Sequence, residues 1–142
     1  MSSLREDVLA ALGAAIAAAV GTAAAVYRTR LAPVAREEGA VIILRPDEET
    51  VEAISQFRVR RDLTFSLTVI MRDGTPDRAA DSLLATVHGT VMADQTVGGR
   101  VARVLEVDTK WDLEVADQAA AAIVLRYTAR YLTPHDALTA VP

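Results

Sequence analysis

The feature that constrains the fold most is a long run of alternating residues at Phe57–Met71. Every second position is apolar, with Arg61 as the exception, and the positions between them up to Thr68 are polar or charged. A period of two is typical of a β-strand that packs one face on a core. At about 3.3 Å per residue such a strand is roughly 50 Å long. We therefore expect a hairpin arm that projects beyond the domain, or a bend at Arg60–Asp62.

Four further segments also have strand patterns. Val101–Val115 alternates, with Glu106, Asp108, Lys110, Asp112 and Glu114 on its polar side and Val101, Leu105, Val107, Trp111, Leu113 and Val115 on its apolar side. After a turn at Ala116–Gln118, Ala121–Tyr131 alternates in the same way. Ala25–Arg30 and Val41–Leu44 are shorter runs, and we expect Arg45-Pro46 to end the second of them.

Two segments have helical patterns. Ser3 and Glu6 form a capping box, and an apolar stripe with helical spacing follows as far as Gly21-Thr22. Pro76 stands in the first turn of a second helix that ends near Asp94. The predicted order is α-β-β-β-α-β-β, an α+β fold with an antiparallel-rich mixed sheet of about five strands and two helices on one face. We expect one domain over residues 1–132 and a C-terminal tail over 133–142.

The stretch Val8–Val26 has no charged side chain, which raises the alternatives of a membrane span or a secretion signal. Most of the stretch is Ala and Gly, and its few larger apolar residues contribute little to insertion. The acidic Glu6 and Asp7 stand where a signal peptide needs positive charge. We expect a soluble helix, with a membrane-anchored or secreted α/β binding domain as the alternative.

The composition excludes several classes of chemistry. The chain has 15 basic and 19 acidic residues in 142, which is not the balance of a non-specific nucleic-acid binder. It has no Cys, so thiol nucleophiles, disulfides and Cys-based zinc sites are excluded. Ser82 and His88 share the second helix but lie about 9 Å apart along its axis, too far for a nucleophile and its base. The sequence predicts no catalytic residue, no cofactor and no metal, and so no enzyme.

Charge is distributed unevenly over the predicted strands. Arginines lie on the polar faces of three or four strands, whereas Val101–Val115 is mostly acidic. Neighbouring strands of opposite charge would form cross-strand ion pairs. Alternatively, the basic surface of one subunit meets the acidic surface of the next in a head-to-tail ring. The candidate subunit-contact residues are Arg28, Arg30, Arg58, Arg60, Arg126, Arg130, Glu106, Asp108, Asp112 and Glu114.

The chain resembles the tail terminator family of long-tailed bacteriophages from about Leu4 to Leu132. The resemblance lies in the order and length of the elements. They are the first helix Leu-Arg-Glu-Asp-Val-Leu-Ala-Ala-Leu, then Val-Tyr-Arg-Thr-Arg, Val-Ile-Ile-Leu-Arg-Pro, the long Arg-rich strand, the helix Asp77–Asp94, Val97-Gly98-Gly99 and the closing Ile-Val-Leu-Arg-Tyr-Thr-Ala-Arg-Tyr.

This resemblance implies a structural protein that forms a hexameric ring, caps the tail tube, stops its polymerisation and presents a surface for joining the head. It implies a homo-oligomer, a tail tube protein and a head–tail connector or neck protein as partners, with no sequence-specific nucleic-acid binding and no membrane. The location would be the head-proximal end of the tail in the virion, and the host cytoplasm during assembly. A neck or tail-completion protein of the same assembly is the alternative. The acidic loop expected at Asp47–Gln56 and the turn at Asp73-Gly74 supply the candidate tube or neck contacts, Asp47, Glu48, Glu49, Glu52 and Asp73.

Overall fold

The computed structural model describes residues 2–114 and 119–139 and confirms the predicted α+β class and element order. The predicted turn at Ala116–Gln118 lies outside the described residues, as does Val115. The elements are α1 (Leu4–Val20), β1 (Ala25–Arg28), the 3-10 helix η1 (Arg36–Glu38), β2 (Val41–Ala53), β3 (Arg58–Arg72), α2 (Pro76–Ala93), β4 (Arg103–Glu114) and β5 (Ala120–Pro134).

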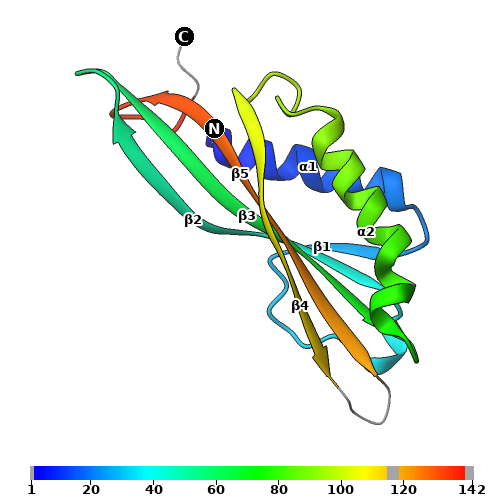
Figure 1. The fold of residues 1–142 in the computed structure, drawn as a ribbon. Helices are drawn as coiled ribbons and strands as arrows, with labels where there is room; N and C mark the ends of the chain where they lie inside the picture. The colour runs from blue at the N-terminus through cyan, green and yellow to red at the C-terminus, as the bar shows by residue number, and fades with distance from the viewer. Residues whose placement is uncertain (1, 115–118, 140–142) are drawn as a thin grey trace.

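The five strands form one mixed sheet in the order β1-β2-β3-β5-β4. β1 runs parallel to β2, and the other neighbouring pairs are antiparallel. Figure 1 shows a long, twisted sheet with both helices on one face, as the sequence predicts. The ends of β2 and β3 reach well past α2, which agrees with the expected projecting hairpin. We call the face away from the helices the open face.

Both helices begin where the sequence predicts. The Ser3 hydroxyl accepts the Glu6 N–H, whereas the Glu6 carboxylate accepts two bonds from Arg28. α1 ends at Val20, and the Gly21 N–H caps it by donating to the Ala17 carbonyl at a φ of 56°. The stretch Val8–Val26 is therefore a helix followed by a turn and the start of β1. No helix among residues 2–114 and 119–139 has the length and apolar character needed to cross a membrane.

The core lies between the helices and the sheet. The alternation of β3 is confirmed, because Leu63, Phe65, Leu67 and Val69 are buried. The Phe65 ring stacks on the buried Tyr127 of β5, with 5.6 Å between ring centroids. From the helices, the buried residues are Leu4, Val8, Leu9, Leu12, Ile16 and Val20 on α1 and Ala80, Leu83, Val87 and Val91 on α2.

The expected end of the second strand at Arg45-Pro46 is wrong. β2 continues to Ala53, with a register shift between Pro46 and Glu48. β1 pairs with β2 only as far as Leu44, so Pro46 stands on a sheet edge where its missing N–H costs no ladder bond. The expected acidic loop is consequently the second half of a strand, and the turn is confined to residues 54–57.

The predicted apolar side of β4 is also wrong in part. A register shift between Glu106 and Asp108 moves the later residues to the other face, and Val104 rather than Leu105 is buried. Beyond the shift, Trp111 and Leu113 lie opposite Ile123 and Ala121 on the helix-bearing face. They are nevertheless each 56% exposed, so the core does not extend to this end of β4.

The chain after Tyr131 contacts the rest of the domain. β5 continues to Pro134, and the His135 N–H donates to the Phe57 carbonyl at 2.9 Å. The Leu138 carbonyl accepts the Leu4 N–H at 2.8 Å. The described residues of the segment 133–142 thus join the start of α1 to the turn between β2 and β3.

Candidate functional site

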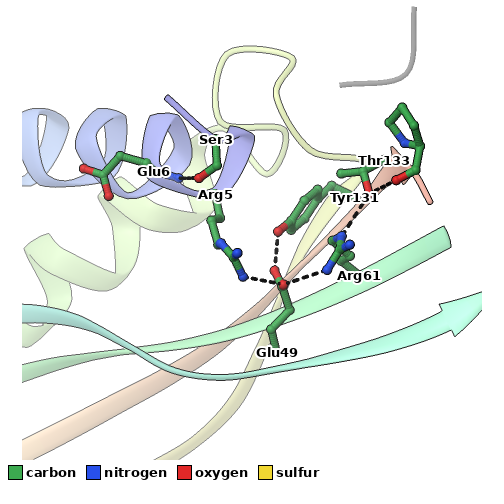
Figure 2. Close-up of polar contacts among 8 residues, drawn as sticks. Ser3, Arg5, Glu6, Glu49, Arg61, Tyr131 and Thr133 are labelled. Carbon is green, nitrogen blue, oxygen red and sulfur yellow. Dashed lines mark hydrogen bonds and ion pairs between the residues drawn. The ribbon is translucent and has the colours of Figure 1, made fainter. Parts of the chain in front are cut away.

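Glu49, a predicted tube or neck contact, points inward. It lies opposite Leu63 on the helix-bearing face, and 9% of its side chain is exposed. Figure 2 shows its carboxylate accepting bonds from three elements: Arg5 Nη1 of α1 at 2.8 Å, Arg61 Nη1 of β3 at 3.2 Å and the hydroxyl of Tyr131 of β5. The carboxylate therefore has little surface left for an outside partner.

The same cluster explains the charged exception in the alternation of β3. Arg61 faces the helix side, donates to Glu49, and donates through Nε to the Thr133 hydroxyl at 2.9 Å. Burial, reinforced by the hydrogen bond to Glu49, raises the pKa of Tyr131, so the phenol keeps the proton that it donates. Together these residues attach the first turn of α1 to the projecting arm of the sheet.

The open face carries a set of cross-strand ion pairs. Arg126 of β5 forms two hydrogen bonds with Asp108 of β4, at 2.8 and 2.6 Å. Arg130 of β5 pairs with Asp62 of β3 at 2.9 Å. Arg60 of β3 pairs with Glu52 of β2 at 2.5 Å. The interpretation of cross-strand pairing is confirmed for these three arginines.

Two further candidate arginines form ion pairs with helices and not with neighbouring strands. Arg28 binds Glu6 of α1 at 2.7 Å, and Arg30 binds Glu38 of η1 at 2.7 Å. Sequence reasoning did not identify Asp62, Glu6 or Glu38 as partners, because each lies on an element that only the fold brings close.

Acid is expected to weaken the fold through the Asp108–Arg126 pair. The hydrogen bonds from Arg126 hold the pKa of Asp108 below its ordinary value. A lowered folded-state pKa stabilises the protein above the unfolded pKa of about 3.9, and this contribution is lost as the pH falls through the folded value. The free energy of unfolding is measured from pH 7 to pH 2 for wild type and Asp108→Asn. Wild type should be more stable than the variant at neutral pH, and this difference should disappear below about pH 4. A difference in stability that does not change with pH would contradict the role of this pair.

The remaining acidic residues predicted to contact a partner differ in whether their side chains are bound within the domain. Asp47 accepts from the Ser66 hydroxyl at 3.1 Å, and Asp73 accepts the Thr75 N–H at 3.0 Å. Glu106 lies 3.5 Å from Nδ1 of His88. Glu48 is exposed, and nothing is described of the Glu114 side chain.

Arg58 and Asp112 differ from the candidates that form ion pairs. Both are exposed, and neither side chain forms a hydrogen bond or an ion pair within residues 2–114 and 119–139. Together with Glu48, they are therefore the candidate charges most available to a partner.

Large apolar side chains are exposed at both ends of the sheet. One group surrounds the turn between β2 and β3, where Phe57 is 65% exposed; a second lies along β4. The first group is Val51, Ile54, Phe57 and Leu132, and the second is Val107, Trp111 and Leu113.

His88 is half-exposed on α2, and its ring packs on Tyr127 with a contact of 2.8 Å between Nδ1 and the Tyr127 hydroxyl. Burial raises the pKa of Tyr127 to about 12. Within the described part of the chain, no three His, Asp or Glu side chains are grouped so that they could hold a metal ion.

No protein-family model and no curated protein sequence matches the chain. Among solved structures, the chain is similar to one chain of a structure titled "Virion of native gene transfer agent (GTA) particle". The two share 20% sequence identity over 90% of this chain and 90% of that chain, with a TM-score of 0.46. A likeness of this size does not indicate what the chain does.

Proposed function

We propose that this chain is a structural virion protein that forms a ring on the tail tube of a long-tailed phage. The ring ends polymerisation of the tube and provides the surface to which the head or neck joins. In this proposal the protein is not an enzyme and has no substrate or cofactor. The proposal starts from the resemblance of Leu4–Leu132 to tail terminators in the order and length of elements.

The observation that carries the proposal is the exposed apolar surface at both ends of the sheet. Contiguous exposed apolar side chains mark sites of protein–protein contact in soluble proteins. Phe57 and Ile54 form such a surface at the turn between β2 and β3, and Trp111 and Leu113 form another on β4. β4 is also an edge strand, whose outer backbone groups are a template for a further contact. A chain with contact surfaces at two separate ends is suited to an assembly with several neighbours.

The first test is the mass of the full-length chain in solution, measured by light scattering at low and high salt. A ring held partly by exposed charges is expected to be a discrete oligomer of about six copies of the 15.2 kDa chain, loosened by salt. A species that needs detergent would favour the membrane-anchored alternative instead.

The second test measures tube growth. Purified tail tube protein is allowed to polymerise with and without this chain, and tube lengths are counted by electron microscopy. We expect shorter tubes that carry the chain at one end. Unchanged lengths, or binding along the sides of tubes, would contradict the capping function.

A further inference from the structure

We infer that, within the proposed ring, the turn end of the β2–β3 hairpin of one copy docks on the end of β4 of the next copy. The hairpin patch consists of Val51, Ile54, Phe57 and Arg58. The β4 patch consists of Trp111, Asp112 and Leu113. This inference rests on the proposed function and names the surfaces by which a second copy of the chain is recognised.

The internal ion pairs narrow the choice of contact residues. Arg60, Arg126 and Arg130 are already bound to acidic residues of neighbouring strands. Using them between subunits would require an internal pair to break for each new pair formed. Arg58 and Asp112 need no such exchange, because neither has a partner among the described residues. They also have opposite charge.

Each of these two charges is adjacent in the sequence to exposed apolar residues. Arg58 follows Phe57, which is 65% exposed, and Asp112 lies between Trp111 and Leu113. Trp111 and Leu113 project from the helix-bearing face, whereas Asp112 projects from the open face of the same end of β4. Aromatic side chains and arginine are enriched at protein–protein interfaces, and Trp and Arg are common among the residues that dominate binding energy. Each end of the sheet therefore offers exposed apolar side chains and one charge, and the two charges are of opposite sign.

The sheet register places the two charges on the same face and at opposite ends. Arg58 lies opposite Pro134, and Asp112 lies opposite Ala122. Both partners occupy even positions of β5, whose odd positions supply the core, so both charges project from the open face. Twelve residues of β5 separate them, which corresponds to about 40 Å. Two copies that meet end to end, with their open faces turned the same way, would bring Arg58 near Asp112.

Two different complementary patches favour a head-to-tail arrangement, which closes into a ring when the rotation permits. The patches are small beside a stable interface, which buries about 800 Å² on each partner. Closing a ring makes the last contact intramolecular and so strengthens all of them together. For this reason we expect loss of one patch to release monomers rather than smaller rings.

A charge-reversal series tests the contact. Arg58→Asp and Asp112→Arg are each expected to raise the concentration at which the oligomer dissociates by about tenfold at low salt, which corresponds to the loss of about 1.4 kcal/mol. The double variant, which restores opposite charges, is expected to return to within about threefold of wild type. Arg78→Asp is the matched control, since Arg78 is exposed on α2 and has no partner among the described residues. No recovery in the double variant would overturn the pairing.

Cross-linking tests the geometry without altering either patch. The chain has no Cys, so Gln56→Cys and Lys110→Cys introduce the only thiols, both at exposed positions. A short bismaleimide is expected to give a ladder of linked chains that ends at the size of the ring. The pair Gln56→Cys and Ser82→Cys, with Ser82 exposed on α2, is expected to stay unlinked.

The mass of wild type separates the possible failures. If wild type is a ring but the Gln56/Lys110 pair does not link, this contact is wrong and the proposed function stands. If wild type stays monomeric both alone and with tail tubes, both are wrong. A ladder that stops at the dimer overturns the head-to-tail arrangement, because it shows a closed two-fold pair.

Discussion

Replacing Glu49 by Ala is expected to lower the free energy of unfolding by about 3 kcal/mol, because it leaves two cations without their anion in a largely covered site. Arg61 keeps 13% of its side chain exposed and loses its only acidic partner among the described residues, while the Tyr131 hydroxyl loses its acceptor. Arg5 is more exposed and can find water, which keeps the expected cost at the low end of that for buried pairs. Urea unfolding followed by circular dichroism measures the loss.

The matched control for this variant is Glu52→Ala on the same strand. Glu52 also pairs with an arginine of β3, but its side chain is 61% exposed. Exposed pairs contribute about 0–1 kcal/mol, so the control should lose much less stability. Equal losses for the two variants would show that the Glu49 cluster does not anchor α1 to the sheet.

The sequence predicts β3 and α2 well because their patterns are local. Alternation alone identifies the buried apolar residues of β3, although not the buried Ser66 on its other face, and Pro76 followed by apolar residues at helical spacing identifies α2. Nothing in such a pattern depends on which strand lies next to the element. The class of fold follows from the order of these elements.

The two errors in the strands have a different origin. Whether Pro46 ends β2 depends on how far β1 extends beside it, and β1 stops pairing at Leu44. The shift between Glu106 and Asp108 depends on the register with β5. A residue's neighbours across a sheet come from distant parts of the chain, so a single sequence does not reveal them.

The candidate contacts show the same limit. The sequence identifies strands rich in Arg and Asp, and many of those residues do lie on the open face. It does not separate Arg60, which binds Glu52, from Arg58, two residues away and without a partner among the described residues. That distinction needs the positions of the opposing strands, and it determines which charges are available to another molecule.

Replacing Phe65 by Ala is expected to cost about 3–5 kcal/mol of unfolding free energy, the range for removing a large aromatic side chain from a packed core. Phe65 is fully buried and stacks on Tyr127, whose hydroxyl in turn bonds His88 of α2. The cavity would lie where β3, β5 and α2 meet. A small domain has about 5–15 kcal/mol of stability in total, so the variant should unfold at markedly lower urea.

Phe57→Ala is the matched control, because it removes the same side chain from the turn that precedes the same strand. With 65% of Phe57 exposed, truncation should change the stability of the monomer by no more than about 0.5 kcal/mol. Its expected effect is on assembly, since the aromatic ring is the largest side chain of the hairpin patch. Urea unfolding at low protein concentration, compared with light scattering at high concentration, separates the two effects. A Phe57→Ala protein that unfolds as easily as Phe65→Ala would place Phe57 among the residues that hold the domain together and would remove the main support for the hairpin patch as a contact surface.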